Sequence, residues 1–307
     1  MQAWLVLLFY LIWVLLGGAL LAPGVYALVQ IASEHYDWLE ELARKPFARY
    51  LNRCMMIQAV IGLWPLLRGF RISSWLEIGL CHPRGQGRHW LIAFGLGMFS
   101  VALILAGGLL GDAWHLKDPP SIGRIAKHLV QTSITAGLVG TIEELIFRGV
   151  LLGVFARSWN WFSAWIFSSV LYAVVHFFTR PVAPTSIHWH SGLTALPGMF
   201  MGLTNWHLLL PAMLNLILAG LALGLLVRRA GNLWMAIGLH IGWIFGLKTI
   251  GFLWKNTPTA NTALWGSKKL LDGWIATVIL LSLLALIWRC SDKQLTQTSE
   301  HSKPEQV

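Results

Sequence analysis

Two adjacent carboxylates and an arginine stand inside a long apolar run, in the segment 140–149 with the sequence GTIEELIFRG. These groups are Glu143, Glu144 and Arg148, and the stretches on both sides of them carry no charge. Charged groups at membrane depth are rare and usually face the interior of a helix bundle or a water-filled cavity. We therefore interpret the three groups as a functional site, with a purely structural ion pair as the alternative.

Helical spacing predicts different tasks for the two carboxylates. Glu144 and Arg148 are four residues apart and share one face of a helix, while Glu143 is turned away by about 100°. Arg148 can therefore neutralise Glu144. Glu143 is left to face a polar cavity, which is what a general base that activates water needs.

Further polar residues occur in the apolar segments that follow. These residues are His176, four positions after Tyr172, then Asn215, and then His240. If their helices form a bundle, Glu143 and the two imidazoles could meet at a water-accessible cavity, where they would activate water and stabilise an oxyanion. Each histidine or the asparagine taken alone is more simply explained as a contact between helices.

Glycines flank His240 in its segment. Gly238, Gly242 and Gly246 recur every four residues and predict a smooth face for close helix packing. His240 lies two residues away from Gly238. It is therefore expected to point to the opposite side of that helix, where a buried imidazole needs polar neighbours.

The order of these motifs resembles the CPBP family, the CAAX-processing and bacteriocin-processing intramembrane proteases, over about residues 129–248. The motifs are EExxxR, an aromatic-xxx-His pair, and a histidine in a later glycine-rich segment. The resemblance implies an all-α fold of eight membrane helices with a polar catalytic cavity inside the bundle. It implies that Glu143 activates the attacking water with support from Glu144 and Arg148. It further implies that His176 and His240 position the water or bind the oxyanion.

Two positions depart from the family pattern. Tyr172 stands where the family commonly has Phe, which retains the ring and adds a hydroxyl group. Ile244 stands four residues after His240, where the family has Asn or Asp. We hypothesise that Asn215 or the indole N–H of Trp243 replaces the missing donor.

The expected activity is hydrolysis of a peptide bond in a membrane-associated or lipid-modified peptide or protein, without cofactor. One alternative is a Zn²⁺ ion held by Glu143, His176 and His240 with water as the fourth ligand, although the chain has no HExxH motif. Another is a proton-coupled transporter that uses the same three groups as a relay. A third is an inactive immunity or scaffold protein with the same fold, for which Ile244 is the hint.

Composition identifies the class of protein. Of the 307 residues, 56% are hydrophobic and 12% are charged, which is typical of a multi-pass membrane protein. The net charge of +10 fits loops that set topology and contact membrane lipids, and it does not favour nucleic acid as a partner. The three cysteines show no CxxC pairing, which argues against a disulfide framework or a thiolate metal site.

The uncharged runs predict eight spans, which are 3–32, 54–67, 90–111, the motif segment from 129, 159–178, 208–227, 233–254 and 271–288. An interfacial helix is expected over 34–53, a loop over 112–127, and a long loop, half-buried as a lid, over 179–206. The predicted organisation is N-terminal helices and charged loops (1–127), a protease core (128–250), a last helix (251–290) and a polar, disordered tail (291–307). The Lys and Arg residues of the loops are divided almost equally between the two sides of the membrane. The positive-inside rule therefore does not fix the orientation of the chain. We expect a bacterial plasma-membrane protein with both termini in the cytoplasm.

Overall fold

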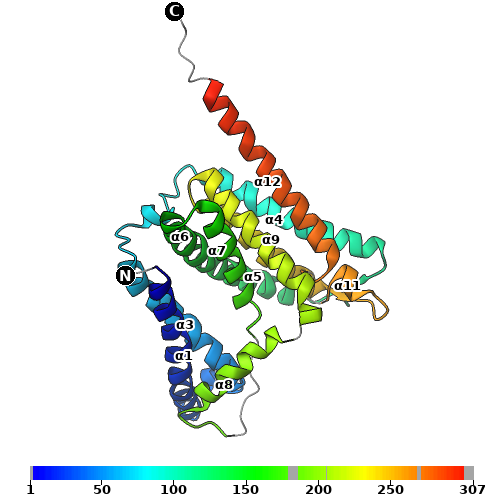
Figure 1. Ribbon diagram of the computed structural model, residues 1–307. Coiled ribbons are helices and arrows are strands. Elements are labelled where there is room, and N and C mark those ends of the chain that lie inside the picture. Colours follow the sequence, from blue (N-terminus) through cyan, green and yellow to red (C-terminus); the bar gives the residue numbers. More distant parts are fainter. Residues whose placement is uncertain (1–2, 179–185, 205, 268–270, 301–307) are drawn as a thin grey trace, which may run out of the picture. The chain divides into compact units, whose positions relative to one another are not determined.

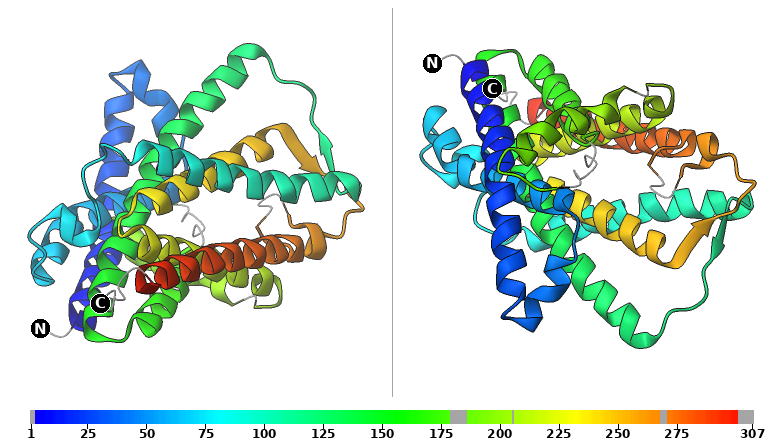
Figure 2. Two further views of the ribbon diagram at one scale, coloured as in Figure 1. Left: turned by 90° about the horizontal axis from the view of Figure 1, so that it is seen from above. Right: turned by 90° about the horizontal axis from the view of Figure 1, so that it is seen from below.

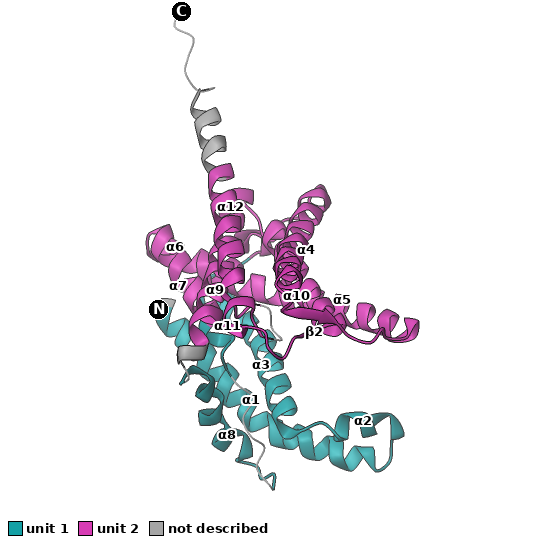
Figure 3. Ribbon diagram, turned by 90° about the vertical axis from the view of Figure 1, so that its right-hand side faces the viewer, with its two compact units in different colours: residues 1–73, 174–206 teal, residues 74–173, 207–307 magenta. Residues whose placement is uncertain are grey.

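Helices account for most of the chain. The computed structural model describes residues 3–178, 186–204, 206–267 and 271–300. The predicted all-α class is confirmed, with one small addition in the expected loop over 112–127. There β1 (Trp114–Leu116) pairs antiparallel with β2 (Trp254–Asn256). The chain divides into two compact units, drawn in Figure 3, of which unit 1 comprises residues 1–73 and 174–206 and unit 2 comprises 74–173 and 207–307.

Unit 1 is built on a helical hairpin, in which α1 and α3 lie side by side (Figure 1). Its elements are α1 (Ala3–Ser33), η1 (Asp37–Leu39), α2 (Glu40–Ala43), α3 (Phe47–Gly69), α8 (Ser191–Met199) and η4 (Phe200–Leu203). The core between α1, α3 and α8 contains Ala19, Leu51 and Ala195. Helix α8 and η4 lie in the predicted long loop, of which residues 179–185 and 205 are outside the described residues.

The second helix of the hairpin begins seven residues before the predicted span at 54. Phe47, Tyr50, Leu51 and Cys54 are buried and recur at helical spacing, so this stretch packs as the first two turns of α3. The interfacial helix expected over 34–53 is therefore replaced by the short elements η1 and α2 and by the start of α3.

Unit 2 contains α10 and the helices that pack against it. Its elements are η2 (Trp75–Ile78), α4 (Gly87–Leu110), β1, α5 (Ile122–Glu144), the π-helical segment η3 (Leu145–Leu152), α6 (Gly153–Ser158), α7 (Trp161–Val175), α9 (Trp206–Ala230), α10 (Trp234–Leu253), β2, α11 (Thr262–Trp265) and α12 (Trp274–Glu300). Helix α10 packs against α4 and α5, and both views in Figure 2 show α4 beside α10. The helical part of α12 extends to Glu300, where the sequence predicts a disordered tail from 291, and residues 301–307 lie outside the described part.

Four helices of the described residues are long and apolar enough to cross a membrane, namely α1, α4, α9 and α10. Helices α7 and α12 supply shorter apolar stretches. The chain is accordingly a membrane protein, and the count of eight spans stays a prediction. The motif segment forms continuous helix from α5 through α6, while α7 ends at Val175, three residues before the predicted end of its span.

The predicted glycine contact between helices is confirmed. A Cβ atom on Gly238 would lie 2.5 Å from the carbonyl oxygen of Trp90 on α4, and one on Gly242 would lie 2.4 Å from that of Phe94. These distances are shorter than real Cβ contacts, so only glycine permits this approach of α4 to α10. These glycines fix the rotation of α10 and thereby direct His240 away from α4.

Substituting Gly97 by Ala is expected to destabilise this interface. Its Cβ would meet the carbonyl oxygen of Leu239 at 2.5 Å, and overpacking of this kind costs about 1–3 kcal/mol. The matched control is Gly95→Ala on the same helix, where a Cβ meets nothing within 4 Å. Thermal unfolding in detergent should show a lower Tm for Gly97→Ala only. Equal Tm values for the two variants would contradict the close helix contact.

Candidate active site

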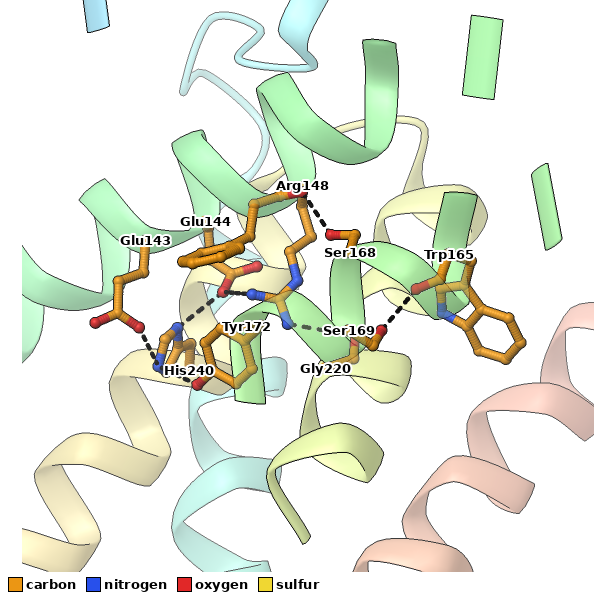
Figure 4. Close-up of polar contacts among 10 residues, drawn as sticks. Glu143, Glu144, Arg148, Trp165, Ser168, Ser169, Tyr172, Gly220 and His240 are labelled. Atoms are coloured by element: carbon orange, nitrogen blue, oxygen red, sulfur yellow. Dashed lines mark hydrogen bonds and ion pairs between the residues drawn. The ribbon is translucent and has the colours of Figure 1, made fainter. Parts of the chain in front are cut away.

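The two glutamates lie at the end of one helix, where the backbone changes its winding. Glu143 and Glu144 are the last two residues of α5, and the π-helical segment η3 with Arg148 follows at once. Short π-helical segments inside α-helices are rare and occur often at functional sites. On α7, Ser168 donates a hydrogen bond of 2.8 Å to the carbonyl oxygen of Phe147, which anchors η3 to its neighbour (Figure 4).

The predicted pairing of Glu144 with Arg148 is confirmed. Arg148 Nη1 donates to Glu144 Oε1 at 3.0 Å, and the two side chains are only 1% and 0% exposed. Arg148 Nη2 also donates to the carbonyl oxygen of Gly220 on α9 at 3.3 Å. The guanidinium lies over the ring of Tyr172, with its carbon 4.3 Å from the ring centre. The buried Arg148 therefore links η3, α7 and α9, and Glu144 balances its positive charge.

His240 connects both glutamates to α10. Its Nδ1 lies 2.8 Å from Glu144 Oε1, and its Nε2 lies 3.7 Å from Glu143 Oε2 (Figure 4). An ionised carboxylate only accepts hydrogen bonds, so we assign a hydrogen to Nδ1 that is donated to Glu144. This contact fixes the ring and directs Nε2 toward Glu143 and the hydroxyl group of Tyr172, which is 3.3 Å away.

Glu143 and Glu144 differ in their access to solvent. The side chain of Glu143 is 25% exposed, whereas that of Glu144 is fully buried. The distance of 3.7 Å between Glu143 and His240 is too long for a hydrogen bond. Catalytic hydrogen bonds are often long before substrate binds and shorten in the complex. The arrangement thus has one accessible carboxylate beside an imidazole that a second, buried carboxylate orients.

The helix that carries Tyr172 ends one residue before His176. Helix α7 ends at Val175, and the following backbone turns through a hydrogen bond from Phe177 N to the carbonyl oxygen of Val174. His176 belongs to unit 1, while Glu143 and His240 belong to unit 2. The participation of His176 therefore stays a prediction, and the residues that the structure brings together are Glu143, Glu144, Arg148, Tyr172 and His240.

The hypothesis that Asn215 replaces the missing donor near Ile244 is corrected. The Asn215 amide donates to the carbonyl oxygens of Leu271 at 2.6 Å and Gly273 at 3.0 Å. Its oxygen accepts a hydrogen bond of 2.6 Å from the hydroxyl group of Thr277. All three contacts tie α9 to the beginning of α12, so the amide hydrogens are already used in a structural connection.

Trp243 is likewise engaged elsewhere. Its Nε1 donates to the hydroxyl group of Ser100 on α4 at 2.9 Å. The indole therefore faces the α4 side of α10, the same side as Gly238 and Gly242, whereas His240 faces the glutamates. Neither part of the hypothesis on the missing donor agrees with the contacts observed.

Two contacts of the site have little or no signal in the sequence. The Tyr172 hydroxyl beside His240 joins residues 68 positions apart, and only the replacement of the usual Phe marks it. The bond from Ser168 to Phe147 has no signal, because serine is common in apolar helices and the accepting group is a backbone carbonyl.

Among the described residues, no group of three His, Cys, Asp or Glu side chains is arranged to hold a metal ion. The pair formed by Glu143 and His240 offers two ligand types that Zn²⁺ accepts, and the third predicted ligand, His176, belongs to the other unit.

Comparison with known proteins gives one match. Residues 125–246 match the family model described as type II CAAX prenyl endopeptidase Rce1-like. No curated protein and no solved structure matches this chain. The matched range begins in α5 and ends in α10, so it includes both glutamates, Arg148 and His240.

Proposed function

We propose that this chain, whose residues 125–246 match the Rce1-like family model, is a CAAX-protease-like enzyme, and specifically a glutamic intramembrane endopeptidase. The proposed substrate is a membrane-associated peptide or protein that carries a lipid near its carboxyl terminus. The observation that supports this proposal most is the contact of accessible Glu143 with His240, whose other nitrogen is held by the ion-paired Glu144.

The proposed reaction begins when Glu143 accepts a proton from a water molecule. The water oxygen attacks the scissile carbonyl carbon, and the carbonyl oxygen becomes an oxyanion. In its doubly protonated form, His240 can donate from Nε2 to that oxyanion while Nδ1 stays bonded to Glu144. Glu143 then returns the proton to the leaving nitrogen as the C–N bond breaks, which yields a carboxylic acid and an amine. His176 is proposed to help position the water.

Glu144 and Arg148 are proposed to act through His240. Their buried ion pair keeps a negative charge at the Nδ1 side of the ring, which fixes the tautomer and the direction of Nε2. In this mechanism Glu143 reacts with water and Glu144 orients the His240 ring. The two roles require that Glu143 is accessible and Glu144 is buried.

Cleavage of a defined substrate tests the proposed function. Purified protein in liposomes is incubated with a peptide whose cysteine near the carboxyl terminus is isoprenylated, and products are identified by mass spectrometry. We expect release of a short carboxyl-terminal fragment. An intact peptide together with a proton flux across the vesicle membrane would instead indicate the transporter, and an intact peptide without flux would indicate an inactive protein of this fold.

Chelation is expected to leave the activity unchanged, because the proposed chemistry uses Glu143 as the base and requires no metal. Cleavage rates are measured before and after treatment with EDTA and with 1,10-phenanthroline, and the metal content of the protein is measured in parallel. Loss of activity on chelation, restored by one equivalent of Zn²⁺, would contradict the metal-free mechanism.

The position of the protein in the cell is also part of the proposal. We propose that it resides in a bacterial plasma membrane with both termini in the cytoplasm. Protease accessibility of tags fused to either terminus, in intact and in permeabilised cells, would test this orientation.

A further inference from the structure

The hydroxyl group of Tyr172 borders the reacting groups of the site. Tyr172 lies on α7 and is 3% exposed, and its hydroxyl oxygen is 3.3 Å from His240 Nε2 (Figure 4). The same nitrogen is 3.7 Å from Glu143 Oε2. A scissile carbonyl attacked by water from Glu143 and bound by His240 would therefore also lie within reach of the phenol.

The ring of Tyr172 is held firmly on two sides. The Arg148 guanidinium carbon is 4.3 Å from the centre of the Tyr172 ring. The Phe147 ring contacts it edge to face, with 5.3 Å between the two ring centres. A tyrosine fixed in this way needs no reorganisation to donate a hydrogen bond.

Three other side chains do not serve as hydrogen-bond donors to the oxyanion, because they are already hydrogen-bonded elsewhere or have no donor. Asn215 is bonded to the beginning of α12, and Trp243 is bonded to Ser100 on α4. Ile244, one helical turn after His240, packs among apolar residues and has no polar atom in its side chain. The tyrosine hydroxyl is the donor that the described contacts place at His240 Nε2.

We propose that Tyr172 is a catalytic residue whose hydroxyl donates a hydrogen bond to the oxyanion of the tetrahedral intermediate, next to His240. The phenol keeps its proton throughout, so the water and the two products balance without it. This inference rests on the proposed peptidase function and names the donor that compensates for Ile244.

The first test is Tyr172→Phe, which removes the hydroxyl and keeps the ring over Arg148. Loss of one oxyanion donor lowers kcat by about 10²-fold, and KM should stay near its wild-type value because the bond forms in the transition state. The matched control is Tyr50→Phe, a buried tyrosine in unit 1 that donates to the carbonyl oxygen of Leu42 at 2.7 Å. That control should keep kcat. A Tyr172→Phe enzyme with wild-type kcat would overturn the proposal.

A second measurement separates direct donation from mere support of the His240 ring. A phosphinic peptide carries a tetrahedral, negatively charged centre, so its Ki should rise about as much as kcat/KM falls in Tyr172→Phe. An unaltered Ki beside a reduced kcat would overturn direct donation. In the double variant Tyr172→Phe/Ile244→Asn, we expect the new amide to restore at least part of the lost kcat.

Failure of this inference and failure of the proposed function give different results. If wild-type protein does not cleave the lipidated peptide, both are overturned. If wild-type protein cleaves it and Tyr172→Phe cleaves equally well, only the role of Tyr172 is overturned.

Discussion

Replacing Glu143 by Gln is expected to lower kcat about 10³-fold, the range found when a general base is removed. Glutamine has the size of glutamate but cannot accept a proton from water, so the fold and substrate binding should persist. Cleavage of the lipidated peptide in liposomes, measured under saturating substrate, gives kcat directly. The side chain of Glu143 is the accessible carboxylate beside His240, which is why the loss should be this large.

The matched control for this substitution is Glu40→Gln. Glu40 lies on α2 in unit 1, where its side chain is 57% exposed and pairs with Arg44. The same change of charge there should leave kcat unaltered. A Glu143→Gln enzyme that is as active as the Glu40→Gln control would remove Glu143 from the mechanism.

Replacing Arg148 by Met is expected to destabilise the protein by about 3–5 kcal/mol, because it leaves Glu144 buried and without its counter-charge. The change should appear as a lower midpoint of unfolding in detergent. Converting Glu144 to Gln in the same protein should recover part of the loss, since no charge then remains buried.

The chain offers a control for the arginine with the same spacing. Arg44 and Glu40 are also four residues apart and 2.7 Å from each other, but their side chains are 76% and 57% exposed. Exposed pairs contribute little, so Arg44→Met should leave the unfolding midpoint unchanged. Equal midpoints for Arg148→Met and Arg44→Met would show that the buried pair does not hold η3 in place.

Local spacing made part of the site predictable. Glu144 and Arg148 are four residues apart, and one helical turn brings such residues together whatever the rest of the chain does. The rotation of α10 was also predictable, because Gly238 and Gly242 must face a close neighbour and His240 is offset from them. The contact of His240 with Glu144 then agrees with that offset.

Contacts that depend on tertiary structure were not predictable from spacing. The π-helical winding after Glu144 has no sequence rule, and it still allows the pairing with Arg148. The missing donor at Ile244 favours Asn215 as a replacement, but the Asn215 amide is instead satisfied by backbone carbonyls before α12. A polar residue in an apolar helix signals a partner, and the sequence does not identify that partner.

Helix ends were the least predictable feature. The apolar run through Phe178 favoured a longer α7, yet the helix stops at Val175, and His176 lies in the turn that follows. Conversely, charged residues before Cys54 suggested an interfacial segment, although Phe47 and Tyr50 bury their rings as part of α3. Hydropathy gives the approximate span, while packing decides where each helix begins and ends.

Cleavage in water enriched in ¹⁸O shows whether water held by Glu143 hydrolyses a peptide bond within the membrane. Wild-type protein in liposomes should convert the isoprenylated peptide into a shortened product whose new carboxylate contains ¹⁸O. The Glu143→Gln protein should form almost none of it. An intact peptide with wild-type protein, or the same labelled product at the same rate from both proteins, would contradict hydrolysis by water that Glu143 activates.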